Sequence, residues 1–540
     1  MVRQHHATLA HTHQTPDRVD AWILGSSLAS LASAVHLISD ANVPASHIHI
    51  LESQSTPGDG IISSGNPLNG YDHRPGCLPS FSDVCMEKLL ALVPSPSGSG
   101  RTVKEDIEKF YDDEDCQEVP TTHILTKGDH GPKIIKIGKL DLGLKDRMKL
   151  TILMLRSEDR LNKKRIDQLF SKAFFDSVFW TVFSTIFTFQ PWHSAPEFRR
   201  CLRRYFHEFR NLNTKSPLDS IQFNQFESII MPIIQFLQNR GVDFRLCTKV
   251  TNIVTHSDCG AETVSAIHVL HNSCQETFYV RPDDIVIVTL GSVTSGSSSG
   301  SNKIPPPLKT MIAEEELDEN WSLWLNLGTK YPGLGDPYNF CTRLTESRLE
   351  TFTVTLRDSD YFDRLVKLTC DKPGIGHLVS LKHSNWKISI CIPRQPFFSC
   401  QPDNVQTFWG YGLCPEREGN FVKKPMLVCS GEEIMVELLR HLDFPLDTIL
   451  ENSITIPSVM PRRTASLLPR FRGDRPTVIL DGMTNLAVIG QFVEIPDETT
   501  VSMDYGVRGA QLAVSHLMDL HKQPEESRKT FSFPFFNFWV

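Results

Sequence analysis

The fold is decided by the stretch AWILGSSLASLASAVHLISD, residues 21–40, together with HIHILE, residues 47–52. Its first four residues predict a short apolar strand, Gly25 a turn, and the small residues after it a helix. HIHIL predicts a second strand that ends at Glu52. This order is typical of a βαβ unit that binds a dinucleotide, because the helix N-terminus faces the pyrophosphate and the acid binds the ribose.

The glycine pattern of this unit is weak. The G-x-G-x-x-G fingerprint falls on Gly25, Ser27 and Ser30, so only the first glycine is kept. A serine in the middle position crowds the approach of the backbone to a pyrophosphate. The alternative is a plain βαβ layer that binds no ligand.

Two later apolar strands also end at glycines. DIVIVT, residues 284–289, leads into Gly291-Ser292, and LAVI, residues 486–489, leads into Gly490-Gln491. Continuous apolar runs are typical of parallel strands that are covered on both faces. We therefore expect four parallel neighbours in one sheet, with a dinucleotide at the carboxyl ends of the strands. Residues 243–280 alternate as an accessory antiparallel sheet would.

Composition excludes several classes of protein. The chain has 540 residues, of which 40% are hydrophobic and 22% charged, so it is neither disordered, collagen-like nor embedded in a membrane. A net charge of -8 without a basic block argues against nucleic acid as a partner. The 13 cysteines lack CxxC pairs and metal spacing, which favours reduced thiols and no metal site. Because the N-terminus lacks a secretory apolar segment, we expect an intracellular protein, cytoplasmic or peripherally attached to a membrane.

Six blocks are specific enough to compare with known families: FQPWHSAPEF (189–198), NQFESII (224–230), FTVTL (352–356), SNWKISI (384–390), WGYGLCPEREGNFVKKPM (409–426) and GQFVEIPDETT (490–500). With these blocks in order over about residues 18–520, the chain resembles the FAD-binding oleate hydratase family, also called the myosin-cross-reactive antigen family. The resemblance implies FAD as cofactor. It also implies addition of water to a cis double bond of a free fatty acid.

The strands and the resemblance together predict an α/β fold. It comprises a discontinuous Rossmann-like FAD/dinucleotide-binding domain, a mixed α+β substrate domain and a helical cap. We place the FAD-binding domain at residues 19–139, 216–302 and 441–520, the cap at 140–215 and the substrate domain at 303–440, with a disordered tail at 1–18 and an aromatic tail at 521–540. The apolar stretch 173–189 is too polar for a membrane span and predicts a buried or membrane-facing helix.

The resemblance also implies how FAD is held. The positions that it assigns to the cofactor are Gly25, Ser27, Ser30, Glu52, Gly58, Gly76, Gly291, Ser292, Gly490 and Gln491. One departure stands out, because Asp59 lies in the segment that is glycine-rich in the family. A carboxylate there opposes the phosphate charge unless it points away, so loose or lost FAD binding is the alternative.

A polar anchor for the fatty carboxylate is implied by family positions that match Gln225, Thr464, Ser466 and Arg470. Arg470 offers a permanent charge and bidentate donors, which suit a carboxylate. The alternative for Arg470 is a surface salt bridge with Asp474 or Asp497.

The two catalytic positions depart from the family. The family's loop Arg-Gly-Gly-Arg-Glu falls on residues 74–78, so Leu78 replaces the Glu that positions and deprotonates water. The family's Tyr that acts as the proton donor falls on Cys201. Leu78 cannot carry a proton. The candidates for acid–base work are therefore His193, Cys201, Asp72 and His73. Ordinary loop hydrogen bonds for Asp72 and His73, and an inert buried thiol for Cys201, are the alternatives.

Three functions remain open at this stage. The first is a lyase-like enzyme that acts on an unsaturated long-chain or polyketide-like carboxylic acid by hydration, dehydration or double-bond isomerisation. The second is a non-catalytic fatty-acid-binding protein, and the third, less favoured because a second nucleotide fingerprint is lacking, is a redox flavoenzyme. A homodimer is left open. The aromatic end KTFSFPFFNFWV, residues 529–540, either packs back on the body or makes a peripheral membrane contact.

Overall fold

The computed structural model describes residues 15–75, 84–111, 122–128, 131–135, 141–205, 221–258, 260–307, 317, 319–371, 377–521 and 524–525. Several predictions concern residues outside these ranges. They are residues 1–14 of the predicted disordered tail 1–18, the cofactor position Gly76, the replaced catalytic position Leu78, and residues 526–540 of the predicted aromatic tail 521–540. The remainder of the first tail is ordered, because Pro16–Arg18 form the 3-10 helix η1.

A parallel sheet of five strands forms the nucleotide-binding half. In spatial order it contains β18 (Leu486–Ile489), β11 (Ile285–Thr289), β1 (Ala21–Leu24), β2 (Ile48–Leu51) and β7 (Asp243–Arg245). Every neighbouring pair is parallel. The residues of β1, β11 and β18 are all buried, as continuous apolar runs require. The prediction of four parallel neighbours is confirmed.

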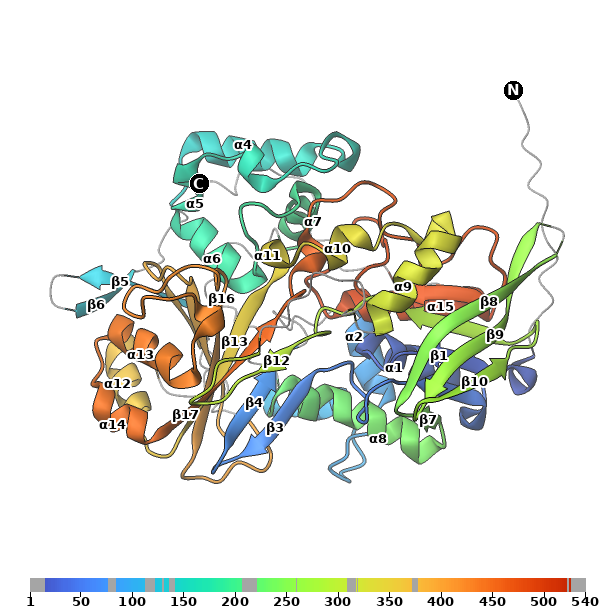
Figure 1. Ribbon diagram of the computed structural model, residues 1–540, viewed down its shortest axis with the longest axis horizontal. Coiled ribbons are helices and arrows are strands. Elements are labelled where there is room, and N and C mark those ends of the chain that lie inside the picture. Colours follow the sequence, from blue (N-terminus) through green and yellow to red (C-terminus); the bar gives the residue numbers. More distant parts are fainter. Residues whose placement is uncertain are drawn as a thin grey trace.

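Helices cover this sheet (Figure 1). Helix α1 (Leu28–Ser39) follows β1 and packs against α15 (Asp504–Leu517), α8 (Met231–Arg240) and α2 (Val84–Leu92), and α2 contacts α3 (Val103–Tyr111). The small residues of α1 allow a close approach, because a Cβ on Gly506 of α15 would lie 3.4 Å from that of Ala29.

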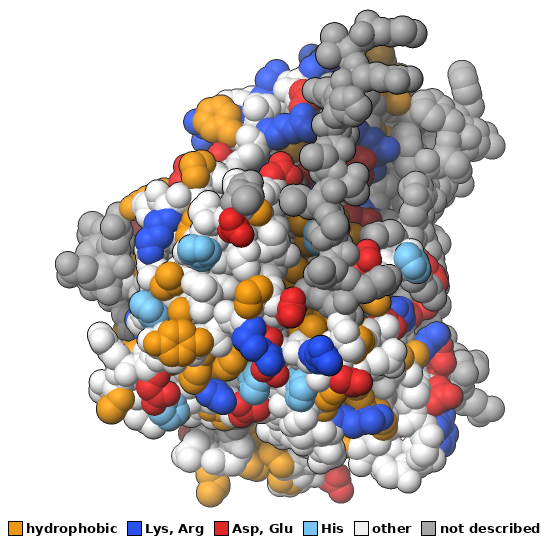
Figure 2. Space-filling view, turned by 90° about the vertical axis from the view of Figure 1, so that its right-hand side faces the viewer, with side chains coloured by type: hydrophobic (Ala, Val, Ile, Leu, Met, Phe, Trp, Pro, Cys, Tyr) orange, Lys and Arg blue, Asp and Glu red, His pale blue; other side chains and the backbone are white. Residues whose placement is uncertain are grey.

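An accessory sheet lies beside the nucleotide-binding half, as predicted for residues 243–280, except that residues 243–245 form β7 and pair in parallel with β2. Its antiparallel strands are β8 (Thr248–Asp258), β9 (Ala261–His271) and β10 (Cys274–Tyr279), and α9 (Glu319–Lys330) packs on β8. Figure 2 views the molecule from this end and shows basic, acidic and hydrophobic side chains interspersed.

A second, mostly antiparallel sheet of eight strands forms the other half. Its order is β12 (Ser298–Ser299), β17 (Ser453–Met460), β13 (Leu349–Leu356), β16 (Gln406–Gly412), β15 (Ile388–Ile392), β14 (His377–Leu381), β5 (Thr122–Gly128) and β6 (Gly131–Ile135). Helices α12 (Asp360–Thr369), α13 (Gly431–Leu442) and α14 (Leu446–Glu451) lie together at this end of the molecule (Figure 1). The hairpin of β3 (Ile62–Asn66) and β4 (Gly70–Arg74) contacts β13 and β17.

The predicted domain boundaries differ from the sheet membership. Strands β5 and β6 fall within the proposed FAD-binding range 19–139, yet β5 pairs with β14 of the second sheet. Likewise β17 falls within 441–520 but pairs with β13. Short alternating strands do not encode which sheet they join, because pairing depends on partners distant in sequence.

Helices α4 (Leu144–Leu155), α5 (Lys172–Phe175), α6 (Val178–Phe187) and α7 (Ala195–Arg204) form the predicted helical layer, with the short α10 (Tyr338–Cys341) and α11 (Leu344–Ser347) nearby in Figure 1. The aromatic run in α6 is core, since Phe179, Phe183 and Phe187 are buried. Of the two alternatives for residues 173–189, the buried helix is therefore correct. Within the described part of the chain, no helix combines the length and the apolar character needed to cross a membrane.

Candidate functional site

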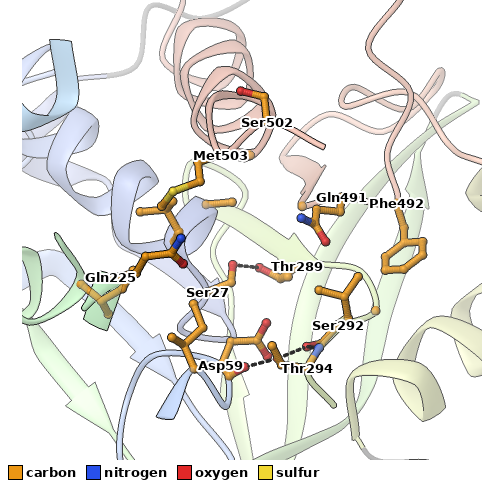
Figure 3. Close-up of a pocket in the computed structure, with 18 residues that line it drawn as sticks. Ser27, Asp59, Gln225, Thr289, Ser292, Thr294, Gln491, Phe492, Ser502 and Met503 are labelled. Atoms are coloured by element: carbon orange, nitrogen blue, oxygen red, sulfur yellow. Dashed lines mark hydrogen bonds between the residues drawn. The ribbon is translucent and has the colours of Figure 1, made fainter. Parts of the chain in front are cut away.

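A cavity opens at the carboxyl ends of β1, β11 and β18, where a doubly wound sheet binds its ligands (Figure 3). Its volume is about 710 Å³, open mouth included. Five predicted cofactor residues line it: Ser27, Gly291, Ser292, Gly490 and Gln491. The sequence-based prediction of a ligand at this sheet edge therefore agrees with the location of the cavity.

The first turn of α1 presents its N-terminus to this cavity. Ser27 is the N-cap of α1, and its hydroxyl accepts a hydrogen bond from the Ser30 amide at 3.3 Å. Gly25 precedes the helix with a φ of +97°, a conformation that a side chain disfavours, and an added Cβ would meet Thr289 at 3.4 Å. The backbone thus turns here as it does in dinucleotide-binding proteins.

Thr289 explains how two serines replace glycines in the fingerprint. Its hydroxyl lies 2.6 Å from that of Ser30. It also lies 3.2 Å from that of Ser27 (Figure 3). The two serine hydroxyls are directed to the end of β11. Both serine hydroxyls therefore have a hydrogen-bond partner, so replacing the glycines by serines leaves no buried polar group unpaired at these two positions.

A second pocket adjoins the first and is lined by Gly25, Glu52 and, as a shared residue, Thr289. Glu52 is 5% exposed, and its carboxylate accepts hydrogen bonds from the amides of Ser26 at 3.0 Å and Gln54 at 2.9 Å. The hydroxyls of Ser26 and Ser53 also donate to it. The acid at the end of β2 is thus held in place at the pocket by its own loop.

Asp59 lies on the floor of the cavity as it is drawn in Figure 3, near Ser292 and Thr294. It adopts a left-handed φ of 54°. Its backbone carbonyl accepts a hydrogen bond from the hydroxyl of Thr294, and its carboxylate accepts one from Asn320 at 3.3 Å. The extra acid noted in the sequence is therefore a lining residue and does not point away from the cavity.

Gln225 lines both this cavity and a third pocket. It precedes the π-helical turn η7 (Phe226–Ile230) and lies opposite Gln491 in Figure 3. It lines the small third pocket together with His73, Phe397 and Trp409. Its neighbour Asn224 donates to the Phe397 carbonyl at 3.1 Å, which ties this turn to the second half of the protein.

His73 is the predicted catalytic candidate that faces this junction. Its amide donates to Thr353 at 3.0 Å, and its ring nitrogen Nδ1 lies 2.9 Å from the Ser63 hydroxyl. Burial lowers the pKa of His73 to about 3, so the imidazole is neutral. Asp72 contacts Arg74, Ser299 and Ser458, because successive residues of β4 point to opposite faces. Of this pair, only His73 is a lining residue of the third pocket.

Arg470 occupies a buried ion cluster. Its guanidinium donates to Glu197 at 2.9 Å and to Glu494 at 2.8 Å, and Arg475 also donates to Glu197 at 3.1 Å. Burial opposes ionisation of Glu197. The surrounding guanidinium groups, of which Arg475 has the largest effect, nevertheless hold the pKa of Glu197 below its usual value. The expected alternative partners of Arg470, Asp474 or Asp497 at the surface, are replaced by these two glutamates.

Of the other predicted anchor residues, Ser466 lies at this cluster, because Arg475 donates to its backbone carbonyl. Thr464 donates to the Ser347 carbonyl at 3.0 Å and lies 3.4 Å from Nε2 of His193. Ser466 accepts from Thr500 at 3.3 Å. Gln225 lines both the main cavity and the His73 pocket. Contacts among the described residues thus tie Ser466 to the ion cluster and Thr464 to His193.

His193 and Cys201 are both fully buried. His193 accepts from the Gln190 amide at 3.0 Å, and burial lowers its pKa to about 3. Burial, reinforced by the charge of Glu197, raises the pKa of the Cys201 thiol well above its usual value. Cys201 is therefore a poor proton donor, and His193 makes the contacts of a structural residue.

His73 and His193 predict a loss of stability in acid, and burial of His36 lowers its pKa in the same direction. The folded pKa values of His73 and His193, about 3, lie below the ordinary 6.5, so below pH 6.5 only the unfolded chain binds these protons. At about 1.4 kcal/mol per pH unit for each of these two histidines, the free energy of unfolding should fall by roughly 4 kcal/mol between pH 7 and pH 5. Urea unfolding at both pH values measures this difference.

Replacing one histidine gives the control for this prediction. His73→Gln should remove about half of the fall that is due to His73 and His193, about 2 kcal/mol, and His256→Gln, at an exposed position of β8, is the control. An unchanged pH dependence in His73→Gln would contradict the burial of a neutral imidazole.

Sequence reasoning missed several residues of the site. Thr289, Thr294, Phe492, Ser502 and Met503 line the main cavity but match no motif. The signal for Thr289 was present, because it is the last residue of a predicted strand whose carboxyl end faces the ligand. Glu197 was also missed, although an acid followed by two arginines in an apolar block indicates a buried ion pair.

Comparison with known proteins agrees with this architecture. Two solved structures have TM-scores of 0.52: an oxidoreductase from Methanosarcina mazei (13% identity, 90% of this chain and 98% of that chain) and cyclohexylamine oxidase from Brevibacterium oxydans IH-35A (11% identity, 93% and 99%). At these identities the likeness concerns the fold alone, and it confirms the predicted α/β class.

Two relatives are much closer in sequence. An oleate hydratase of Streptococcus pyogenes serotype M49 (strain NZ131) is 34% identical over 519 residues, which cover 93% of this chain and 86% of the relative. A linoleate hydratase of Lactiplantibacillus plantarum is 28% identical over 544 residues, which cover 92% and 93%. The model of the MCRA family matches residues 18–515. The resemblance noted in the sequence is confirmed: the chain belongs to the MCRA family.

Proposed function

We propose that this protein binds FAD and acts on an unsaturated long-chain carboxylic acid. The reaction is hydration, dehydration or double-bond isomerisation, carried out with a remodelled catalytic site. One observation carries the proposal: Gln225 lines both the cavity at the parallel sheet and the pocket beside His73. The two pockets share Gln225 as a wall, so a ligand in the His73 pocket would be separated from the cofactor cavity by this one side chain.

The residues present fit FAD. The turn at Gly25 and the N-terminus of α1 would hold the pyrophosphate, and Glu52 in the adjoining pocket would face the ribose. Gly490, with a φ of 106°, lets the backbone after β18 approach the ligand. When bound, FAD supplies a flat, polarisable ring system that places charge beside the substrate. Asp59 lowers the affinity, because its carboxylate shares the cavity with the phosphates.

Substitution at Gly25 tests the cofactor site. Gly25→Val should reduce the flavin retained after gel filtration by at least about tenfold, because Cβ meets Thr289 in a left-handed conformation. Gly143→Val is the matched control, since Gly143 has open space around it. Circular dichroism checks that both variants fold.

The amount of flavin retained by the natural chain tests whether this protein binds FAD. Folded protein that retains no flavin after incubation with excess FAD would contradict the proposal. Asp59→Asn should retain FAD more tightly than the natural chain, because it removes the negative charge from the cavity.

The His73 pocket combines apolar and aromatic side chains with Arg394 and two glutamines. Phe397 and Trp409 pack edge-on against His73, with ring centres 5.0 and 5.4 Å away. The neutral imidazole can accept a hydrogen bond from water, and the Gln225 amide can bind a polar group of the substrate. In hydration, the water oxygen bonds to one alkene carbon and a proton to the other.

The competing function is a non-catalytic fatty-acid carrier. Holoprotein is incubated with oleate, linoleate and their hydroxy acids, and the products are identified by mass spectrometry. A gain or loss of one water, or a shifted double bond, supports the enzyme. Bound fatty acid recovered unchanged in every case would favour the carrier.

A further inference from the structure

The outward face of α4 is apolar. Leu144 is 80% exposed, Met148 63%, Ile152 45% and Leu155 54%. These positions follow one another at helical spacing, and at 3.6 residues per turn they fall within an arc of about 80°. We call these four residues the α4 stripe.

The α4 stripe is not needed to hold the helix on the body. Leu150, Leu153 and Met154 of the same helix are buried, and α4 packs on α7 through its inner side. The helix is therefore apolar on two separate faces. A soluble surface helix ordinarily has a polar outer face, so the second apolar face requires its own explanation.

Basic residues border the α4 stripe on both sides. Around the helix axis, Lys145, Lys149 and Arg156 follow the stripe on one side and Arg147 on the other. The single acid of residues 144–156, Asp146, falls on the inner side. Lys145 and Arg156 are exposed, while Arg147 and Lys149 are half-buried and donate to the Leu142 and Leu169 carbonyls, both at 2.9 Å. This local positive charge contrasts with the net charge of -8 of the whole chain.

We infer that α4 is an interfacial helix that docks on the surface of an anionic lipid bilayer. An apolar stripe bordered by lysine and arginine is what such a helix presents, because the stripe enters the acyl boundary while the cations meet the lipid phosphates. Figure 1 shows α4 at the outer edge of the molecule, where a flat surface can reach it. The inference concerns binding alone and does not depend on the proposed reaction.

A second copy of the chain fits this face less well. In a twofold symmetric contact the same patch meets itself, so the basic borders of the two α4 helices would face each other. Like charges opposed in this way repel. A bilayer containing anionic lipid offers the opposite charge along the whole stripe.

Vesicle co-sedimentation of the full-length protein tests the inference. We expect the protein to pellet with vesicles of mixed phosphatidylcholine and phosphatidylglycerol, less with pure phosphatidylcholine, and less again at high salt. The double variant Leu144→Glu with Met148→Glu should lower the partition constant by at least about tenfold. The matched control is Leu68→Glu, at an equally exposed leucine (80%) on the β3–β4 hairpin, which should bind like the natural chain.

Each remaining outcome overturns the inference. Natural protein that does not pellet with anionic vesicles, or a double variant that pellets equally well, removes the role of α4. Concentration-dependent self-association that the double variant abolishes, without vesicle binding, assigns the stripe to a second copy. If a form ending at Ser527 loses all binding although α4 is intact, the aromatic end rather than α4 makes the contact.

Discussion

We expect this protein to convert oleate to its hydroxy acid at least about 10²-fold more slowly than the streptococcal oleate hydratase assayed beside it. Losing a general acid or a general base typically costs about 10²–10⁴ in rate. The register of the sequence places Leu78 and Cys201 at those two positions. Mass spectrometry of the products under equal conditions measures the difference.

The structure strengthens this expectation at one of the two positions. Cys201 has no exposed surface, lies among the aromatic residues under α6, and has a thiol pKa raised by burial. A thiol of raised pKa is a weaker acid than an ordinary one, so it cannot replace a phenol that protonates an alkene. Leu78 lies outside the described residues, so its assignment to the position of the family's Glu rests on the sequence alone.

The paired substitution Leu78→Glu and Cys201→Tyr should raise oleate hydration. The tyrosine adds a ring at a site without free surface, so we expect it to lower the stability by about 1–3 kcal/mol as well. Thermal unfolding of Leu78→Glu alone gives the matched control. Robust hydration of oleate by the natural chain would show that other residues perform the acid–base work.

Arg470→Ala should destabilise the protein by about 3–5 kcal/mol. The substitution leaves the carboxylates of Glu197 and Glu494 without one of their cations, and Glu197 is fully buried. Removing one partner of a buried ion pair is costly because the other charge stays in a medium of low polarity. Chemical or thermal unfolding of the purified variant measures the loss.

Arg472→Ala provides the control for this result. Arg472 is 83% exposed at its side chain and pairs with Asp159 at 2.9 Å, so its loss should cost less than about 1 kcal/mol. If Arg470→Ala is as stable as the natural chain but binds fatty acid more weakly, the family's anchor role applies to Arg470 after all.

The sequence by itself determined the nucleotide-binding sheet. Four of its five strands are short and apolar, and a glycine or an acid follows each of these four within two residues, whereas β7 was not predicted as part of this sheet. These are local properties, set by burial on both faces and by the turn that a glycine permits. The helix after Gly25 and the core character of the aromatic run in α6 were predictable for the same reason.

The tertiary structure alone decided which polar groups meet. Glu197 lies 273 residues from Arg470 in the chain, so no pattern within either segment records their pairing. The same holds for β5, which joined the second sheet, and for Gln225, which lines two pockets at once. A buried charge takes whatever partner the packed core brings within reach, because leaving it unpaired costs more than any local preference. Local sequence thus specified the scaffold, and the distant contacts of the folded chain specified the chemistry that it holds.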